Sequence, residues 1–412
     1  MIKTFPKIAF RRQGKIDPGS IDDFIRNDGF SGLKQALLMK PSDIVESIEK
    51  SGLKGRGGAG FPTGMKQRFT AESSDESEIR YVVCNADEGE PGTFKDRMLM
   101  ESDPFSVIEG IIIAGYAVRA THAYVYIRGE FYQSIENIKN AIKQSYEQGF
   151  LGKNILGSDF SFEMDVFLGA GSYLCGEELT LLESLEGKRG YPRIKPPFPA
   201  EKGLWKKPTL INNVETFSHI PFIVSEGFEE YAKIGTEESK GTKLFCVSGN
   251  VRKTGVFELP MGVSLRDLVF DVCEGMKEGF EFTGALLGGA AGTFVDSSFL
   301  DTPLAYETLK QKGATLGSGA VIIIDNKTDL KAMMKSVLSF FKHESCGKCV
   351  PCRIGTKILD DEIAKTGLSD KNLDFMLQES EYMAQNSLCP LGQSPIMPVK
   401  SVIKYFKNRI IE

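Results

Sequence analysis

The strongest constraint on the fold is an alternation of strand-like and helix-like segments between residues 79 and 187. The segments IRYVVCN, AYVYIRG and SFEMDVFLG are short and rich in β-branched and aromatic residues, which is typical of strands. They are followed in turn by the amphipathic segments PFSVIEGIIIAGYAVRA, YQSIENIKNAIKQSYEQGF and YLCGEELTLLESLEG. Strands that alternate with helices form a largely parallel sheet, so these residues predict an α/β unit.

The chain has 412 residues, more than one hydrophobic core usually organises. A charged, glycine-containing segment, GFEEYAKIGTEESKGTK, predicts a domain boundary near residue 240. Beyond it, KLFCVSGNVRKTGVFELP reads as a hairpin, SLRDLVFDVCEGM as a helix and AVIIIDN as a closing strand. Four amphipathic segments with short connections follow and predict a helix bundle. The expected units are a partly helical lead-in (1–50), the α/β unit (51–239), a small α+β unit (240–328) and the bundle (329–412).

Composition narrows the class of protein. Apolar residues make up 41% and charged residues 25%, as in folded globular proteins, and the formal net charge is −5. An acidic balance without a basic tract argues against nucleic acid as the main partner. The start of the chain has no apolar leader, and the most apolar run, SVIEGIIIAGYAV, is too short to span a bilayer. A cytoplasmic protein without direct membrane insertion is therefore expected.

The stretch GLKGRGGAGFPTGMK contains the pattern G-x-G-x-x-G at Gly55, Gly57 and Gly60. That pattern indicates a dinucleotide site only when a strand precedes it, whereas the preceding SDIVESIEKSGL has helical spacing. A P-loop is also excluded, because Met65 stands where its second glycine is required. The glycines therefore need another purpose. Lys66 and Arg56 could bring positive charge to a phosphate, although single basic residues more often lie on the surface.

Three unusual segments follow the predicted strands, where parallel sheets bind their ligands. They are CNADEGEPGTFKDR, RGE and GAGSYLCGEE. The glycines of the third could offer bare N–H groups to a phosphate. Glu177 and Glu178 suit the dipole of the helix that they begin. They could also accept ribose hydroxyls and repel the additional phosphate of NADP. In KPPFPA, prolines stiffen the chain around Phe198, which could hold its ring ready to stack on a base.

Four cysteines carry the most specific pattern in the chain. Cys346, Cys349 and Cys352 have the spacing C-x2-C-x2-C, and Cys389 stands before a proline. Ferredoxin-type [4Fe–4S] sites use this spacing and a Cys-Pro. A structural zinc is the alternative, with His343 close by, although zinc sites more often pair cysteines two and two. The remaining cysteines show no such spacing and are expected to be small buried residues.

A nucleotide site together with an iron–sulfur site indicates electron transfer. With only three histidines and no Ser-His-Asp candidates, the sequence gives little support to hydrolysis. A [4Fe–4S] cluster takes one electron at a time, whereas NADH gives two as a hydride. A flavin can mediate between them.

The motifs together resemble one family over nearly the whole chain. GLKGRGGAGFPTGMK, CNADEGEPGTFKDR, GAGSYLCGEE, PRIKPPFPA, INNVET, ESCGKCVPCRIG and SLCPLG match the NADH-binding flavoprotein subunit of respiratory complex I and its relatives in NAD-linked hydrogenases and formate dehydrogenases. The resemblance implies a Rossmann-like FMN and NADH domain, a ubiquitin-like β-grasp domain and a C-terminal four-helix bundle with a [4Fe–4S] cluster. The implied activity is hydride transfer between NAD(H) and FMN, followed by one-electron transfer through the cluster.

The resemblance also implies roles for individual residues. It places Glu90 near the nicotinamide amide and Glu178 at the adenosine ribose, and these two are the candidate catalytic residues. Cluster ligands are implied at Cys346, Cys349, Cys352 and Cys389. Contacts to FMN or NAD(H) are implied at Gly55, Arg56, Gly57, Gly58, Ala59, Gly60, Lys66, Asn85, Asp87, Glu88, Tyr173, Gly176, Glu177, Asn212 and Asn213, and at Lys195 and the adenine-stacking rings Phe61, Phe69 and Phe198.

The implied partners are iron–sulfur subunits: a thioredoxin-like [2Fe–2S] subunit and a larger iron–sulfur or catalytic subunit. GGAAGTFV is closer to the hydrogenase and formate dehydrogenase relatives than to complex I. Gln67 stands where the family often has Trp, and Ile354 where Glu is common. The rival interpretation is a non-catalytic assembly module with a structural zinc and a degenerate nucleotide pocket. The physiological direction of electron flow stays open.

Overall fold

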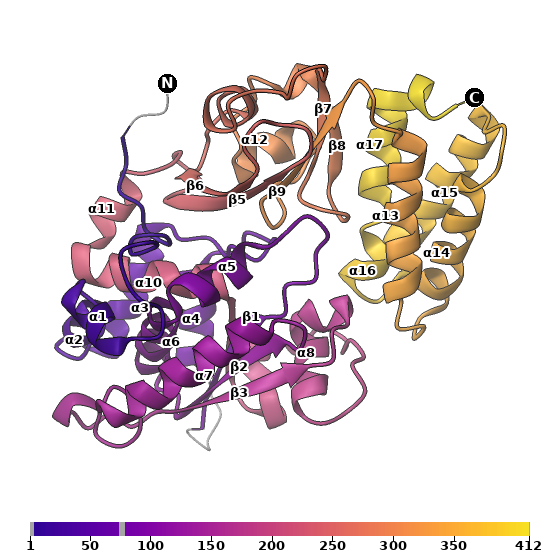
Figure 1. The fold of residues 1–412 in the computed structure, drawn as a ribbon. Coiled ribbons are helices and arrows are strands. Elements are labelled where there is room, and N and C mark those ends of the chain that lie inside the picture. Colours follow the sequence, from indigo (N-terminus) through magenta and orange to yellow (C-terminus); the bar gives the residue numbers. More distant parts are fainter. Residues whose placement is uncertain (1–3, 74–78, 412) are drawn as a thin grey trace.

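The computed structural model describes residues 4–73 and 79–411. Figure 1 shows three parts: a sheet with helices on its faces, a second sheet beside it, and a helix bundle at the C-terminal end. Residues 1–3 of the predicted lead-in and Glu412, the last residue of the final predicted helix, lie outside the described residues.

The first sheet has four parallel strands in the order β3-β2-β1-β4. They are β1 (Tyr81–Ala86), β2 (His122–Arg128), β3 (Glu163–Gly169) and β4 (Thr209–Asn213). The three strands expected from the alternation are confirmed, and so is their parallel arrangement. The sequence reading missed β4, which spans only TLINN at the far edge next to β1.

Helices cover both faces of this sheet (Figure 1). Val82 and Cys84 of β1 point to the main core, which α6 (Pro104–Val118) and α10 (Val214–Glu226) complete. Val83 points to the opposite face and packs with leucines of α8 (Glu178–Leu185). The other helices of this part are α5 (Lys95–Ser102), α7 (Tyr132–Glu147), α9 (Pro199–Lys202) and α11 (Phe228–Ala232), with 3-10 turns η1 (Ile155–Gly157), η2 (Tyr173–Gly176) and η3 (Leu204–Lys206).

The predicted lead-in is partly helical, as expected, and packs into the same core. Its helices are α1 (Ile21–Arg26), α2 (Ser31–Ala36) and α3 (Pro41–Ser51), and α4 (Thr63–Ala71) follows the glycine stretch. Glu109, buried inside α6, accepts hydrogen bonds from the backbone N–H groups of Phe30 and Leu33 at 3.1 and 3.0 Å. Burial raises the pKa of this carboxyl to about 7. The single acid in the most apolar segment thus caps the start of α2.

The second sheet has the strand order β6-β5-β9-β7-β8, with the first strand, β5, parallel to the last, β9. This is the β-grasp arrangement. Its elements are β5 (Thr242–Ser248), β6 (Gly255–Pro260), β7 (Phe282–Leu287), β8 (Thr293–Asp296) and β9 (Ala320–Asp325), the π-helical turn η4 (Asp267–Val272), η5 (Ser297–Phe299) and α12 (Tyr306–Gln311). The predicted hairpin and closing strand are confirmed, whereas β7 and β8 were missed.

The four predicted C-terminal helices are confirmed as a bundle. They are α13 (Leu330–Glu344), α14 (Val350–Ile363), α15 (Asp370–Asn386) and α17 (Ile396–Phe406), and the short α16 (Pro390–Gln393) and η6 (Lys407–Arg409) accompany them. Each long helix packs against its two neighbours around a core that includes Phe341, Leu359 and Met383. Helix α17 also packs against β8, which joins the bundle to the second sheet.

A buried ionic network joins the two sheets. Glu215, in the first turn of α10, accepts from the ammonium groups of Lys95 at 2.9 Å and Lys243 at 2.5 Å. Lys95 also forms an ion pair with Asp96, its neighbour in α5, whereas Lys243 lies in β5. The network therefore connects the part around the first sheet with the second sheet. All four side chains are buried. The lysines hold the pKa of Glu215 at about 2 despite its burial.

Within the described residues, no helix combines the length and apolar character that crossing a membrane requires.

The contact between α6 and α10 yields a test of the core. Pro221 in α10 cannot donate an N–H to the carbonyl of Phe217, four residues earlier, so that carbonyl is free to approach Gly110 of α6. A Cβ at Gly110 would lie 2.0 Å from this oxygen. We expect Gly110→Ala to destabilise the protein by about 1–3 kcal/mol. Helix propensity alone would stabilise it by about 1 kcal/mol. Thermal unfolding of Gly110→Ala and the wild type distinguishes the two effects. A higher unfolding midpoint for Gly110→Ala would contradict the close contact.

Candidate functional site

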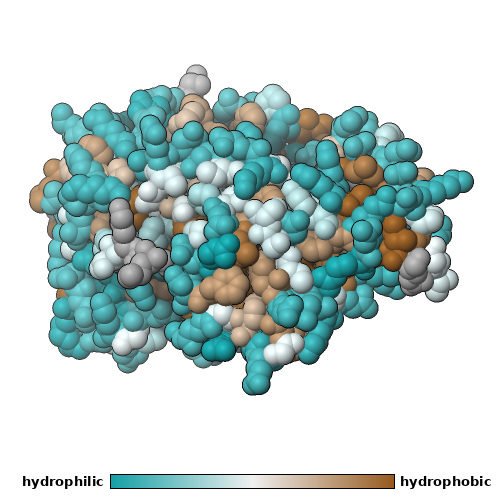
Figure 2. Space-filling model, turned by 90° about the horizontal axis from the view of Figure 1, so that it is seen from above, coloured by the Kyte–Doolittle hydropathy of each residue, from teal (hydrophilic) through white to brown (hydrophobic). Residues whose placement is uncertain are grey.

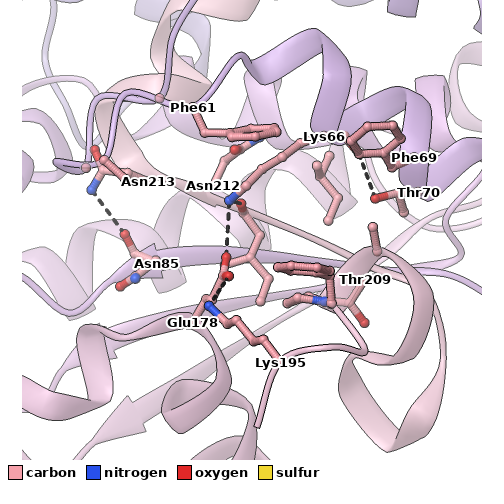
Figure 3. Close-up of a pocket in the computed structure, with 18 of the residues that line it drawn as sticks. Phe61, Lys66, Phe69, Thr70, Asn85, Glu178, Lys195, Thr209, Asn212 and Asn213 are labelled. Atoms are coloured by element: carbon pink, nitrogen blue, oxygen red, sulfur yellow. Dashed lines mark hydrogen bonds and ion pairs between the residues drawn. The ribbon is translucent and has the colours of Figure 1, made fainter. Parts of the chain in front are cut away.

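A cavity of about 1260 Å³ opens at the carboxyl end of β1 and runs along the whole of the edge strand β4. The glycine stretch and α4 form one wall, and the segment from Lys195 to Lys202 forms another (Figure 3). Parallel sheets bind ligands at this edge, as the sequence predicted. The cavity brings together these predicted site residues: Gly55, Gly57, Gly58, Ala59, Gly60, Phe61, Lys66, Phe69, Asn85, Gly176, Glu177, Glu178, Lys195, Phe198, Asn212 and Asn213.

The glycine stretch is a loop between two helices. It leaves α3 and enters α4, so the helical lead-in expected from the sequence is confirmed. The N–H of Gly55 donates to the carbonyl of Phe61 at 2.8 Å and closes the loop. A Cβ at Gly57 would lie 3.1 Å from Cβ of Asn213, so glycine lets the backbone lie close to β4. The loop therefore presents bare backbone to the cavity, which suits an anionic group.

Two lysines and one glutamate meet in the cavity (Figure 3). Glu178 accepts from Lys195 at 2.7 Å and from Lys66 at 3.3 Å, and Lys66 also donates to the carbonyl of Ile211 at 3.1 Å. Burial would raise the pKa of Glu178, but the two ammonium groups hold it below its usual value. The Glu177 carboxylate accepts hydrogen bonds from the N–H groups of Leu179 and Thr180 and so caps the start of α8. This agrees with the prediction that Glu177 suits the dipole of the helix that it begins.

The Arg56 side chain does not face the cavity. It is fully buried, and its guanidinium donates to the Tyr231 hydroxyl at 3.0 Å and to the Lys240 carbonyl at 2.6 Å. The structure does not place this side chain among the cavity residues, because its partners in α11 and just before β5 hold it inward. Its Nε and Nη1 atoms have no partner among the described residues, and a contact with phosphate stays a prediction. The Arg56 backbone N–H donates to Thr216 in α10, which fixes the loop.

Three phenylalanines form the rim of the cavity. Phe61, Phe69 and Phe198 are 42%, 50% and 52% exposed, and all three line it. Large apolar rings usually lie inside a protein, so three half-exposed rings around one opening indicate a surface for a flat ligand. Figure 2 shows apolar side chains gathered in small patches among polar ones on the face that it draws. Each phenylalanine would be read as a core residue when taken alone, and the structure brings the three together.

Three asparagines line the floor of the cavity and differ in whether their side-chain amides already have hydrogen-bond partners. The Asn213 amide donates to Asp96 at 2.7 Å, and its oxygen accepts from Lys95 at 3.0 Å. Asn85 donates to the carbonyl of Gly176 at 2.8 Å. The amide nitrogen of Asn212 is buried and has no partner within the described residues. Buried amides are normally hydrogen-bonded, so this donor, beside a loop of bare backbone, fits a bound group rich in acceptors such as FMN.

Two acids that follow β1 lie outside the cavity lining. Both oxygens of Asp87 are buried without a partner among the described residues, and burial raises the pKa of this carboxyl to about 7. Glu88 accepts the backbone N–H groups of Asp96 and Arg97 at 2.9 and 3.0 Å. Its carboxylate therefore caps α5, and Glu88 does not line the cavity, so the cofactor contact expected of it stays a prediction.

Glu90 and Tyr173 also lie outside the cavity lining but contact each other. The Tyr173 hydroxyl donates to Oε2 of Glu90 at 2.5 Å. Tyr173 begins the turn η2, which ends at Gly176 in the cavity wall. Burial raises the pKa of Glu90, while the hydrogen bonds it accepts work in the opposite direction.

The four predicted cluster cysteines lie at one end of the bundle. Cys346 and Cys349 are half-buried in the loop before α14, whereas Cys352 and Cys389 are buried. Burial, together with the other three thiols, raises the pKa of Cys352 to about 11. A Cβ at Gly392 would lie 2.8 Å from Cβ of Cys352, so glycine lets the two cysteine segments pack together.

This donor set fits an iron–sulfur cluster. All eight cysteines of the chain are free. Burial raises the pKa of Cys389 to about 11, whereas the N–H groups of Leu391 and Gly392 point to its thiol and work in the opposite direction, as donors to cluster sulfurs do. Within the described residues, no three His, Cys, Asp or Glu side chains are arranged around a single metal ion. A cubane needs no such arrangement, since each cysteine binds a different iron.

Comparison with known proteins agrees with both halves of the site. Residues 48–222 match the family described as the Nuo51 FMN-binding domain. Residues 332–412 match the NADH-ubiquinone oxidoreductase-F iron–sulfur binding region. A curated relative, the F subunit of NADH-quinone oxidoreductase from Aquifex aeolicus, is 47% identical over 95% of this chain and 90% of its own.

The chain belongs to the FMN- and [4Fe–4S]-binding flavoprotein family of NADH-quinone oxidoreductases. Its cofactors are FMN, a [4Fe–4S] cluster and NAD(H). The match to an iron–sulfur region favours the cluster over the structural zinc that the cysteine spacing left open.

Members of this flavoprotein family also occur in hydrogenases. The NADP-reducing hydrogenase subunit HndC of Solidesulfovibrio fructosivorans is 44% identical over 98% of this chain and 82% of its own. A solved NAD+-reducing [NiFe]-hydrogenase in the H2-reduced state has a TM-score of 0.82 at 36% identity and covers 91% of this chain. A second structure, in the air-oxidised state, has a TM-score of 0.84 at 33% identity. This chain spans 62% and 66% of the solved hydrogenase chains.

Some residues of the site were not predicted from the sequence. Thr70, Thr209 and Pro390 line the cavity. Only Pro390 carried a signal, as the second residue of the Cys-Pro pair. Ala291, whose N–H donates to Glu90 at 3.0 Å, comes from the turn after β7, which local patterning did not connect to the site.

The charge arrangement around Glu178 predicts nucleotide selectivity. Glu178→Gln removes a carboxylate that could accept ribose hydroxyls and repel a 2′-phosphate. We expect the KM for NADH to rise about tenfold, which corresponds to about 1.4 kcal/mol, and NADPH to become a better substrate. Steady-state kinetics with both nucleotides checks this. Glu72→Gln, which changes an acid at another part of the cavity wall, serves as the control. Equal kinetics for Glu178→Gln and the wild type would remove Glu178 from the site.

Proposed function

We propose that this chain catalyses hydride transfer between NADH and FMN and passes single electrons through its cluster to or from a partner subunit. One observation carries the proposal: Pro390, which follows the cluster cysteine Cys389, lines the same cavity as the glycine loop. The nucleotide cavity and the cluster site therefore share a wall. Bound FMN supplies the conversion between a hydride and single electrons, which the amino acids cannot provide.

Different residues of the cavity bind different parts of the two nucleotides. Phosphate oxygens bind to the bare backbone from Gly55 to Gly60 and to the ammonium of Lys66. This assignment is supported by the fact that these residues line the same wall of the cavity. Asn212 donates its free amide to the flavin. Glu178 and Lys195 hold the adenosine ribose, and the rim phenylalanines stack on the adenine.

The domain limits predicted from the sequence belong to this proposal. The first sheet lies inside 51–239, the second inside 240–328, and the bundle helices begin after residue 329, which supports the proposed boundaries. In this scheme the Rossmann-like part binds both nucleotides, and the bundle holds the cluster through Cys346, Cys349, Cys352 and Cys389.

We further propose that the chain acts as a subunit of a larger cytoplasmic complex. Its relatives carry subunit names from quinone oxidoreductases and a hydrogenase. The half-buried Cys346 and Cys349 place one side of the cluster site near the surface, where a thioredoxin-like [2Fe–2S] subunit or a larger iron–sulfur subunit could exchange electrons. Eight free cysteines suit a reducing compartment.

The reverse direction is a second candidate function. Similar chains belong to hydrogenases that reduce NAD+ or NADP. In that case electrons enter through the cluster and leave as a hydride on NAD+. The residues of the cavity serve either direction, because the partner's potential sets it.

The purified holoprotein tests the proposed activity directly. We expect one FMN, about four iron and about four acid-labile sulfides per chain, because one cubane needs them. NADH should bleach the flavin absorbance and reduce ferricyanide. One zinc per chain, or protein that stays without flavin and activity after reconstitution, would overturn the proposal in favour of a non-catalytic assembly module.

Cys349→Ser separates the two halves of the site. We expect it to abolish the cluster while NADH still reduces the flavin at near the wild-type rate, because the hydride reaches FMN before any electron reaches the cluster. Stopped-flow absorbance and iron analysis measure the two events. Cys273→Ser, at the end of η4 and away from the bundle, is the matched control and should keep the cluster. If Cys349→Ser alone stopped flavin reduction, the order of transfer would be wrong.

A further inference from the structure

The turn between β7 and β8 reaches into the neighbourhood of the reaction site. The N–H of Ala291, in this turn, donates to Oε1 of Glu90 at 3.0 Å. The Tyr173 hydroxyl donates to Oε2 of the same carboxylate at 2.5 Å. Each oxygen of Glu90 is thus held by a donor from a different part of the fold. Two such bonds restrict a carboxylate that would otherwise rotate about its side-chain torsions.

A glycine lets the turn approach this closely. Gly289 has φ +85°, and a Cβ there would lie 2.4 Å from Cγ and 2.5 Å from Oε1 of Glu90. No side chain could occupy this space unless Glu90 moved. The second sheet therefore packs directly on Glu90, with backbone against side chain. Local chain geometry alone would not require this, since the same turn could bend away from the first sheet.

Tyr173 is held in turn by the bundle. Its backbone N–H donates to Oε2 of Glu344 at 3.0 Å, and its ring packs edge-on against Phe340 with centroids 4.8 Å apart. Both residues lie in α13, which ends at Glu344, two residues before Cys346. The contacts of Glu90 thus continue through Tyr173 to the helix that leads into the cluster loop.

Glu90 and Tyr173 are both connected to the cavity wall. Glu90 lies in the loop after β1, five residues beyond Asn85, which lines the cavity. Tyr173 opens the turn that ends at Gly176, and the Gly176 carbonyl accepts from Asn85. Glu90 and Tyr173 are therefore each linked, through Asn85 and Gly176, to residues that line the cavity.

We propose that the β7–β8 turn (Gly288–Gly292) and the end of α13 are positioning elements of the reaction site. They hold the Glu90 carboxylate in one orientation at the nicotinamide end, so the site is complete only when all three parts of the fold are packed together. The place of the nicotinamide rests on the proposed function, whereas the clamp on Glu90 rests on the contacts above.

Gly289→Ala tests the clamp in the holoprotein. The added methyl displaces Glu90, and small displacements at a reaction site can cost about 100-fold in rate. We expect kcat for ferricyanide reduction by NADH to fall at least tenfold, with FMN and iron contents unchanged. The control is Gly313→Ala, because Gly313 also has positive φ, +72°, but its Cβ would meet no atom within 4 Å. Equal kcat values for the two variants would overturn the proposal.

Amide hydrogen exchange gives a second readout that does not depend on activity. Tyr173→Phe removes the hydroxyl donor to Glu90 and keeps an aromatic ring against Phe340. We expect faster exchange at the Ala291 amide in Tyr173→Phe and in Glu90→Ala, and wild-type exchange in Gly313→Ala. Unchanged protection in both site variants would show that the clamp does not exist, even if Gly289→Ala fails to fold.

The two proposals can fail separately. A wild-type protein that binds FMN and oxidises NADH, but whose Gly289→Ala variant matches the control, refutes only the clamp. A wild-type protein without flavin or NADH oxidation refutes the proposed function, and amide exchange at residues 288–292 still decides whether the turn holds Glu90.

Discussion

The arrangement of the molecule depends on the buried contacts of the Glu215 carboxylate. It lies in the first turn of α10 and accepts from Lys95 beside the first sheet, from Lys243 in the second sheet and from the N–H of Leu244. Removing one partner from a buried ion pair leaves an uncompensated charge and costs about 3–5 kcal/mol. The two sheets are therefore fixed to each other. Lys95 also contacts Asn213, so this junction lies directly behind the cavity floor.

Local patterns were sufficient for the elements that have strong periodicity. Strands β1 to β3, helices α6 and α7 and the four bundle helices were all expected from the sequence. The misses share a physical cause: β4 has five residues and β8 has four, and glycines flank or interrupt β7 and β8. Such short strands are stabilised by pairing with distant neighbours rather than by their own sequence. The β-grasp order came from the family resemblance and could not be derived from the local pattern.

The site could be predicted as far as topology and motifs determine it. The carboxyl ends of parallel strands lie at one edge of a sheet, so the segments after β1, β2 and β3 were expected to share one site. Residues of the first and third segments line the cavity, whereas Arg128, Gly129 and Glu130 of the second do not. What the sequence could not predict was the direction of individual side chains. Arg56 turns inward because Tyr231 and the Lys240 carbonyl lie behind it, and Glu88 turns to the start of α5. Those partners are fixed by tertiary packing, about which the motif itself carries no information.

The four predicted cluster cysteines are unequally buried, so the cluster site has a buried side and a more exposed side. Cys389 is buried and adjoins the cavity wall through Pro390, whereas Cys346 and Cys349 lie nearer to solvent. A cluster held by these four cysteines would have one side next to the nucleotide cavity and the other nearer to solvent. The two sides would therefore offer an electron different surroundings, buried on one side and accessible to a partner on the other.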